Sequence, residues 1–599
     1  MATVAPPEHV HWELADLLDG AGPERVDELL DESIARAERF AERYRGALAT
    51  IDAAGLREAM TELGEIHDLS GRAGSYAGLL FATDTTDPRR GALLQRVQER
   101  GTALEQLLLF FDLEWAALDD ERAEELLAAD GLDFVRHYLR TARRYRPHLL
   151  SEAEERILSE KALSAHSAWT RLFAEQTAAI EVALGNEKLT LDMALSRLMS
   201  SSRELRRDAA GAVTRALEPG LRTRASIFNA LLVDKMSEDR LRSYPHWLAE
   251  RNLANEARDE SVAALIAAVR GRYELPRRWY RLKAKLLGLD RLADYDRMAP
   301  LAPDDVEVPW PAACELVLTS YGEFSEELGA LAARFFDEHW IDAPPAPGKR
   351  GGAFCSYTVP SVHPYVMLNY TSRRRDVLTL AHELGHGVHA ALAAGQGIFH
   401  QGTPLTLAET ASVFGESLIF ASLLESSPTP AARLALLAEN IEDSIATVFR
   451  QVAMNQFEDR VHTLRREEGE LSVQRLAELW LQAQGELLGD AVELTDGYRC
   501  WWSYIPHIIN SPGYVYAYAY GQLLALSVYE RYLEEGRGFE QRYVELLAAG
   551  GSRSPEELGA IVGVDLADPG FWDRGLDLIE RRLVEAEAMA GEAGGRPRL

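Results

Sequence analysis

Amphipathic helical periodicity runs through most of this 599-residue chain and limits the folds that it can adopt. Apolar residues recur at helical spacing from about residue 9 to 180 and from there to about 340, and the pattern returns after residue 429 and continues to about 590. Ser151-Glu-Ala-Glu154 has the pattern of a capping box at the start of one such helix. The sequence therefore predicts a mostly helical protein, with a short hairpin over residues 180–191 around Gly185-Asn186.

The clearest break in the helical pattern is the segment Ala343-Pro-Pro-Ala-Pro-Gly-Lys-Arg-Gly-Gly352. Residues 365–369, Tyr-Val-Met-Leu-Asn, then have the character of a short strand. Helical periodicity resumes in the run from Asp376 to His389. We therefore expect a small β-sheet beside this helix in an otherwise helical chain.

Two histidines and a glutamate stand together in the pentapeptide His382-Glu383-Leu384-Gly385-His386. Residues four apart lie on one face of a helix, so His382 and His386 can present two imidazoles to one Zn²⁺. Glu383 projects beside such an ion, where a water molecule would sit. This arrangement is typical of zinc peptidases, in which the glutamate is the general base. An ordinary helix with two histidines on one face is the alternative.

A catalytic zinc site needs a third protein ligand, and the candidates within the next few dozen residues are His389, His400, Glu409 and Glu416. The metzincin pattern would place a histidine six residues after His386, but that residue is Leu392. His389 is too close on the same helix to reach the ion easily. Glu409 is the better candidate, because a carboxylate in an apolar helical stretch is costly unless it is paired or binds a metal. Glu416, two turns further on, is either an acceptor that orients a ligand histidine or an ordinary ion-paired or solvated acid.

Several segments carry a resemblance to a known family: Gly351-Gly-Ala-Phe354, His363-Pro-Tyr-Val-Met-Leu-Asn-Tyr370, Leu380-Ala-His-Glu-Leu-Gly-His-Gly-Val-His389, Ala408-Glu-Thr-Ala-Ser412, and His507 with the run Gly513-Tyr-Val-Tyr-Ala-Tyr-Ala-Tyr-Gly521. Over residues 350–521 the chain resembles the oligoendopeptidase F enzymes of the thimet-oligopeptidase family of zinc peptidases.

This resemblance implies one Zn²⁺ per chain, with Glu409 as the third ligand. It implies that His507 and Tyr514 bind the substrate carbonyl in the transition state. It also implies a large two-lobed helical shell around a deep channel that admits only short, unstructured peptides. Tyr518, one helical turn beyond Tyr514, is a further candidate for binding the substrate. A stripe of aromatic core residues is the alternative for the whole tyrosine run.

A peptidase must hold its substrate extended, and an exposed strand edge does so by backbone pairing. We expect residues 365–369 to form such an edge, just before the metal-binding helix. Gly351, Gly352 and Ala353 would let a substrate backbone approach closely, or they form a flexible loop.

The formal net charge is −30, which disfavours nucleic acid and an anionic membrane surface as partners. Solubility explains this charge more simply than an acidic cleft for cationic peptides. Cys314, Cys355 and Cys500 are scattered, so the sequence predicts neither a disulfide framework nor a thiolate zinc site. Because we find no secretory signal and no apolar run near the length of about 20 residues that spans a bilayer, we expect a cytoplasmic protein.

Length and pattern predict an N-terminal helical domain over residues 1–200, a zinc-peptidase catalytic domain over residues 201–590 and a flexible tail over residues 591–599. The predicted function is hydrolysis of internal bonds in short unstructured peptides, with Glu383 as general base. A peptidyl-dipeptidase and a catalytically silent peptide-binding protein are the alternatives. The cleavage preference and the oligomeric state stay open.

Overall fold

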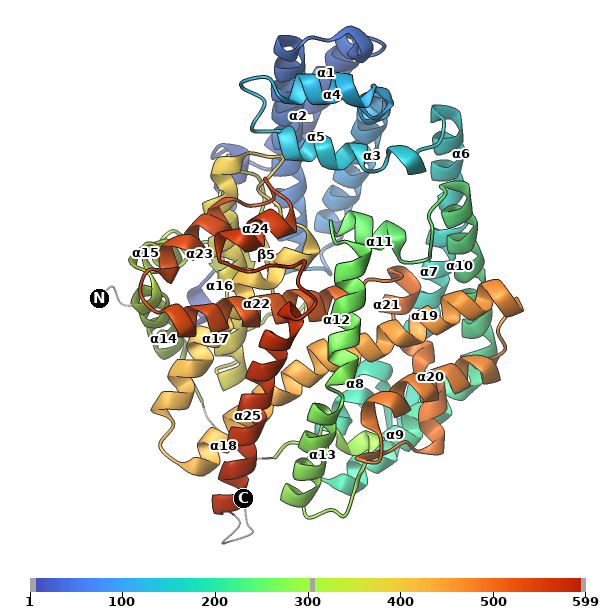
Figure 1. The fold of residues 1–599 in the computed structure, drawn as a ribbon, viewed down its shortest axis with the longest axis vertical. Helices are drawn as coiled ribbons and strands as arrows, with labels where there is room; N and C mark the ends of the chain where they lie inside the picture. Colours follow the sequence, from blue (N-terminus) through green and yellow to red (C-terminus); the bar gives the residue numbers. More distant parts are fainter. Residues whose placement is uncertain (1–6, 302–306, 594–599) are drawn as a thin grey trace. The chain divides into compact units, whose positions relative to one another are not determined.

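The computed structural model describes residues 7–301 and 307–593. The chain forms two compact units, each built from three segments. Unit 1 comprises residues 1–146, 304–425 and 528–566, and unit 2 comprises residues 147–303, 426–527 and 567–599. Helices dominate both (Figure 1). The prediction of a mostly helical protein is confirmed, whereas the two-lobed shell around a channel stays a prediction.

The elements of unit 1 are α1 (Arg25–Tyr44), α2 (Ala53–Thr83), α3 (Pro88–Ala117), α4 (Asp120–Leu127), α5 (Arg136–Arg143), α14 (Trp310–Phe324), α15 (Glu326–Asp337), β4 (Ile341–Asp342), β5 (Phe354–Ser356), β6 (Tyr365–Met367), α16 (Arg374–Ala393), α17 (Leu405–Ser426), α23 (Phe539–Ala548) and α24 (Pro555–Ile561). Asp52 and Asp87 begin α2 and α3 as N-caps, each accepting from a backbone N–H of the first turn. The first helices then pack around apolar residues such as Phe40, Leu56 and Phe111.

The elements of unit 2 are α6 (Glu152–Ala162), α7 (His166–Ala178), β1 (Glu181–Leu184), β2 (Glu187–Thr190), α8 (Leu191–Ser196), α9 (Arg203–Leu217), α10 (Leu221–Leu241), α11 (Ala249–Ala254), α12 (Asp259–Gly271), α13 (Glu274–Leu286), β3 (Leu292–Ala293), α18 (Pro430–Ser444), α19 (Arg450–Glu468), α20 (Val473–Leu488), β7 (Val492–Glu493), α21 (His507–Asn510) and α25 (Phe571–Ala593). Its core includes Phe228, Phe457 and Trp480. Strands β1 and β2 form the predicted hairpin, and Ser151 forms the predicted capping box. Helix α22 (Tyr516–Glu535) begins in unit 2 and ends in unit 1.

A three-stranded sheet precedes helix α16 in the chain. Its strand order is β4-β6-β5, with β6 parallel to β4 and antiparallel to β5. The small sheet beside the histidine-bearing helix is therefore present. The expectation that residues 365–369 form an exposed edge is wrong, because β6 is paired on both sides. Strand β5 is an edge strand of this sheet and contacts α16. It therefore replaces β6 as the candidate strand edge for pairing with an extended peptide.

One described helix, α17, is long and apolar enough to cross a membrane by length and composition alone. This corrects the expectation that no apolar segment approaches that length. Its most apolar stretch is 61% buried inside the structure, as in the core helix of a folded protein. The helix also carries Glu409 and Glu416, which would be expensive in lipid. It is therefore weak evidence for a membrane span.

The compact units do not follow the predicted domain boundaries. The boundary predicted at residue 200 falls inside unit 2, and the segment predicted as catalytic, residues 201–590, contributes to both units. The division into N-terminal and catalytic domains stays a prediction. Helix α25 extends to Ala593, into the tail predicted over residues 591–599, and residues 594–599 lie outside the described part.

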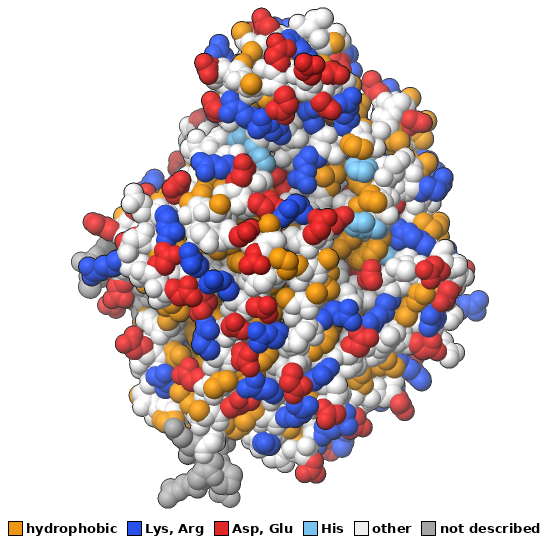
Figure 2. Space-filling view, in the orientation of Figure 1, with side chains coloured by type: hydrophobic (Ala, Val, Ile, Leu, Met, Phe, Trp, Pro, Cys, Tyr) orange, Lys and Arg blue, Asp and Glu red, His pale blue; other side chains and the backbone are white. Residues whose placement is uncertain are grey.

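On the face shown in Figure 2, acidic and basic side chains are interspersed rather than gathered into one patch. Many surface charges are paired, as Arg36 is with Glu32 at 2.8 Å. Exposed pairs of this kind contribute about 0–1 kcal/mol each. Solubility stays the expected role of the net charge of −30.

Candidate metal centre and substrate-binding residues

Two helices of unit 1 carry the predicted metal ligands: α16 holds His382 and His386, and α17 holds Glu409. The helices lie close together at Gly385, where an added Cβ would lie 2.6 Å from the backbone oxygen of Ala411. A residue without a side chain is needed for this approach. The close contact brings the carboxylate on α17 opposite the two imidazoles on α16.

The side chains of these three residues converge. Glu409 Oε2 lies 3.4 Å from His382 Nε2 and 3.6 Å from His386 Nε2. A tetrahedral zinc ion with bonds of about 2.0–2.1 Å holds its ligand atoms about 3.3–3.4 Å apart. Two imidazoles and one carboxylate therefore fit Zn²⁺ in both chemistry and spacing. In the part of the chain that the structure describes, no other group of His, Cys, Asp and Glu side chains converges in this way.

Hydrogen bonds fix the orientation of each candidate ligand. Glu416 Oε1 accepts from Nδ1 of His382 at 2.6 Å, and the ring of His386 donates to a backbone carbonyl of α17. Ser412 Oγ donates to Glu409 Oε2 at 2.7 Å. Partners of this kind select the tautomer that leaves the other ring nitrogen for a metal. Of the two interpretations of Glu416, the structure favours the acceptor that orients a ligand.

Burial and charge shift the pKa values at this centre. Burial raises the pKa of Glu383 to about 7, although the neighbouring His382 acts in the opposite direction. Burial also opposes the charged form of His382, but the hydrogen bond and charge of Glu416 raise its pKa to about 9. For Glu409, burial favours the neutral form, and the two histidines more than offset this and lower its pKa. A buried carboxyl group beside the candidate ligands is placed to take and return a proton.

Glu383 lies against the edge strand. Its side chain is buried, and the backbone N–H of Cys355 in β5 donates to its carboxylate. The edge of β5 therefore runs beside the candidate base. An extended peptide that paired with this edge would pass Glu383.

Three other candidates lie outside the converging group. His389 is buried on α16, and burial followed by the charge of His386 lowers its pKa to about 3. Gly352, with φ +80°, and Ala353 lie in the turn that leads into β5, and Asn369 Nδ2 donates to the backbone oxygen of Gly352 at 2.7 Å. The two turn residues adjoin the edge strand, and their contact with substrate stays a prediction.

His507, Tyr514 and Tyr518 form an aromatic cluster in unit 2. The rings of His507 and Tyr514 stack with their centroids 6.2 Å apart, and Tyr518 meets Tyr514 edge-on at 5.1 Å. The Tyr518 hydroxyl lies 3.4 Å from His507 Nε2. All three are half-buried, whereas Tyr516 and Tyr520 are 0% and 1% exposed. The tyrosine run thus divides into a partly exposed pair beside His507 and a pair of core residues.

A buried acid holds the turn before Tyr514. Gly513, with φ +72°, donates its backbone N–H to Glu458 Oε1 at 3.0 Å, and an added Cβ would lie 2.5 Å from the Leu248 side chain. Glu458 is fully buried, and this burial raises its pKa to about 8, although the Gly513 N–H and Arg251 act in the opposite direction. A neutral carboxyl group therefore anchors the turn at neutral pH.

We expect Glu458 to make the fold less stable as the pH rises. A glutamate ionises near 4.5 in the unfolded chain, whereas Glu458 keeps its proton in the fold to about pH 8. Between pH 4.5 and about pH 8 the unfolded chain binds fewer protons than the folded protein. The free energy of unfolding therefore falls by about 1.4 kcal/mol for each unit that the pH rises. Glu458→Gln keeps an acceptor oxygen without titrating, so its melting temperature should exceed that of the wild type at pH 8.

Thermal melts at pH 5, 6.5 and 8 measure this difference. The exposed Glu467, on the same helix, gives the matched control, and Glu467→Gln should follow the wild-type curve. Equal slopes against pH for Glu458→Gln and the wild type would contradict the argument.

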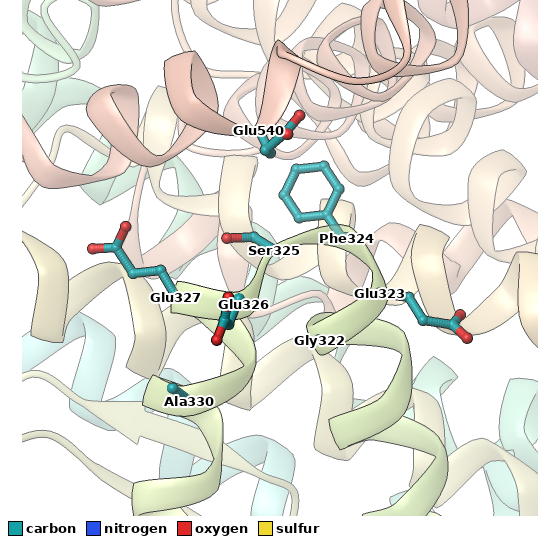
Figure 3. A pocket seen from close by; sticks show the side chains of 8 residues that line it. All are labelled: Gly322, Glu323, Phe324, Ser325, Glu326, Glu327, Ala330 and Glu540. Carbon is teal, nitrogen blue, oxygen red and sulfur yellow. The ribbon is translucent and has the colours of Figure 1, made fainter.

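A cavity of about 500 Å³ elsewhere in unit 1 is lined by several acidic residues, but these residues do not form a candidate metal site. Figure 3 shows the carboxylates of Glu323 and Glu327 pointing to opposite sides of Phe324. Ser325 caps α15 by accepting a backbone N–H, and Glu540 accepts a backbone N–H at the start of α23. These side chains do not converge on a cation.

Sequence reasoning missed three contributors to the sites. Ser412 had a usable signal, because it follows Glu409 by three residues and so lies on the same helix face. Cys355 acts through its backbone N–H, which no residue pattern announces. Glu458 lies 55 residues from the glycine that it binds, so no local pattern joins the two.

Two histidines and a glutamate on neighbouring helices, with a buried glutamate and an edge strand beside them, define the centre of a metallopeptidase. The comparison with known families agrees. The model described as Peptidase family M3 matches residues 197–578, more than half of the chain, and a model described as Oligopeptidase F matches residues 114–181. The chain belongs to peptidase family M3, and the resemblance seen in the sequence is confirmed.

Relatives extend over nearly the whole chain. Oligopeptidase PepF of Bacillus subtilis is 27% identical over 91% of this chain and 82% of its own length. An oligoendopeptidase F homolog of Lactococcus lactis is 27% identical over 86% of this chain and 86% of its own length. The solved structure of oligoendopeptidase-F from Enterococcus faecium covers 95% of this chain and 98% of its own, with 23% identity and a TM-score of 0.72. A solved peptidase structure from Chlamydophila abortus covers 98% of this chain and 100% of its own, with 23% identity and a TM-score of 0.84. The last two likenesses show the fold.

Proposed function

We propose that this metallopeptidase is a zinc-dependent oligoendopeptidase that hydrolyses internal bonds of short, unstructured peptides in the cytoplasm. The observation that carries the proposal is the convergence of His382, His386 and Glu409 beside the buried Glu383. The names of its relatives, which include oligopeptidase and oligoendopeptidase F, support short peptides as substrates. Nucleic acid and membrane partners are not part of the proposal.

The chemistry divides between the metal ligands and Glu383. Zn²⁺ held by His382, His386 and Glu409 supplies a Lewis acid and lowers the pKa of water. In the first step the water oxygen adds to the carbonyl carbon, the water proton moves to the Glu383 carboxylate, and the carbonyl π pair moves onto the carbonyl oxygen. In the second step the electron pair on the oxyanion re-forms the C=O bond, the C–N bond breaks with its electron pair leaving on nitrogen, and Glu383 returns the proton to that nitrogen, which gives a carboxylic acid and an amine.

The developing negative charge on the carbonyl oxygen needs hydrogen-bond donors. We assign this task to His507 and Tyr514, as the family resemblance implies, with Tyr518 in contact with the substrate. The partial exposure of these three rings, in contrast to the buried Tyr516, supports the assignment.

Tyr514→Phe should lower kcat by about 10²–10³-fold, because one oxyanion donor typically contributes that much. It should change KM little and leave the metal content unchanged. Tyr516→Phe is the matched control: it should leave kcat nearly unchanged but cost about 1 kcal/mol of stability, because the Tyr516 hydroxyl accepts from Asn255 Nδ2 at 3.0 Å. Steady-state kinetics and thermal melts measure both, and equal losses of kcat would show that the oxyanion donor lies elsewhere.

Mass-spectrometric mapping of the cuts in a mixed peptide library tests the proposed function. Internally quenched peptides blocked at both ends should be cut at internal bonds, and a stable folded protein should stay intact. Release of C-terminal dipeptides alone, with blocked peptides inert, would indicate a peptidyl-dipeptidase. A chain that binds peptides but cuts none, with or without zinc, would be a silent binder. Glu383→Gln protein prepared in parallel shows whether any cutting comes from a contaminant.

A further inference from the structure

The loop that follows β5 is held in a strained and anchored conformation. Thr358 has φ +58°, a left-handed conformation that is costly for a β-branched residue. Its hydroxyl donates to the backbone oxygen of His363 at 2.8 Å. Val359 is 1% exposed and packs against α2 at Gly71, where an added Cβ would lie 2.5 Å from Val359 Cγ1. The side chain just before this pair, that of Tyr357, is therefore fixed in place.

Tyr357 faces the metal centre of its own unit. Its ring centroid lies 6.5 Å from that of His386 and 6.4 Å from that of His389. The ring is partly exposed, but its hydroxyl oxygen is buried and has no hydrogen-bond partner among the described residues. A buried hydroxyl without a partner is destabilising, so its retention in an anchored loop points to a partner that arrives with the reaction.

The surroundings of this hydroxyl define what it can do. A tyrosine hydroxyl ordinarily ionises only at about pH 10, so this one keeps its proton at neutral pH and can donate a hydrogen bond but cannot serve as a base. In the proposed reaction Glu383 takes the proton of the attacking water. The acceptor that remains for the Tyr357 hydroxyl is therefore the oxygen of the scissile carbonyl group.

We propose that Tyr357 is a catalytic residue whose hydroxyl donates a hydrogen bond to the scissile carbonyl oxygen as that oxygen gains negative charge. The inference rests on the proposed function and adds a donor from the unit that holds the metal ligands. A peptide that paired with the edge of β5 would pass Cys355 before it reached Tyr357, so the two proposals place the substrate beside the same strand.

Tyr357→Phe in the full-length zinc-loaded chain tests the proposal. We expect kcat for an internally quenched peptide to fall by about 10²–10³-fold with KM little changed. A phosphinic peptide, whose tetrahedral phosphinate imitates the reacting carbon, should bind more weakly by a similar factor, as isothermal titration would show. A kcat within threefold of the wild type, or an unchanged affinity for the phosphinate, would overturn the proposal.

Thermal melting, with and without zinc, separates this role from a structural one. Tyr321 is the matched control: its buried hydroxyl donates to the backbone oxygen of Ala381 on α16 at 3.0 Å. Tyr321→Phe should lower the melting temperature, whereas Tyr357→Phe should leave it unchanged or raise it, because only the first substitution breaks a hydrogen bond. An equal decrease in both variants would overturn the proposal.

Wild-type turnover in the same assay distinguishes failure of the role of Tyr357 from failure of the proposed function. An active wild type with an equally active Tyr357→Phe variant overturns the role of Tyr357 alone. A zinc-loaded wild type that cuts no peptide overturns the proposed function and this role together.

Discussion

Glu383→Gln should retain zinc and lose turnover by about 10²–10⁴-fold, the range that a positioned general acid–base group contributes. Glutamine has nearly the shape of glutamate, so α16 and both histidines keep their places, and its amide still accepts from the Cys355 N–H. It cannot take a proton from water. The structure makes this a clean test, because Glu383 is not one of the three side chains that converge as a candidate metal site.

Metal analysis and kinetics on the same preparation measure the two halves of this expectation. Glu425→Gln, an exposed glutamate near the end of α17, is the control and should behave as the wild type. Turnover above a tenth of the wild-type value would remove Glu383 from the mechanism. Loss of zinc from Glu383→Gln would instead mean that Glu383 helps to hold the metal.

Glu409→Ala should lose both metal and activity, because Glu409 is the one member of the converging group that α17 contributes. Glu416→Ala should keep the metal with about 10–100-fold weaker affinity, as expected when the partner of a ligand histidine is removed. The two residues form a matched pair on one helix: Glu409 Oε2 lies 3.4 Å from His382 Nε2, whereas Glu416 Oε1 accepts from Nδ1 of the same ring.

Competition with a chromophoric chelator gives both affinities. If Glu416→Ala lost the zinc and Glu409→Ala retained it, the assignment of ligand and orienting partner would be reversed. Equal affinities in the two variants would mean that the metal is not bound through Glu409.

Local pattern was sufficient for the helices and for the candidate ligands. The four-residue spacing of His382 and His386 fixes their common face, and the apolar surroundings of Glu409 indicate a carboxylate that needs a partner. The hairpin around Gly185 follows from alternation and a turn, both of which are local. These features depend on contacts within a few residues, which a sequence displays directly.

Contacts between distant segments were beyond local pattern. Residues 365–369 look like an edge strand, and only the pairing of β6 with both β4 and β5 shows otherwise. Each compact unit joins three separated segments, which helical periodicity cannot reveal. The unpartnered hydroxyl of Tyr357 and the buried carboxyl of Glu458 become visible only when their surroundings are known.

The contact at Gly385 changes how the metal-binding pentapeptide should be searched for in other sequences. A pattern that treats both residues between Glu383 and His386 as arbitrary accepts many chance matches. In this architecture the second of them must be glycine, because a Cβ there would lie 2.6 Å from the backbone oxygen of Ala411 and separate α17 from α16. A match with a larger residue at that position could still present two histidines, but it could not receive its third ligand from a helix packed as α17 is. The glycine therefore distinguishes helices that can complete this centre from helices that merely carry the pattern.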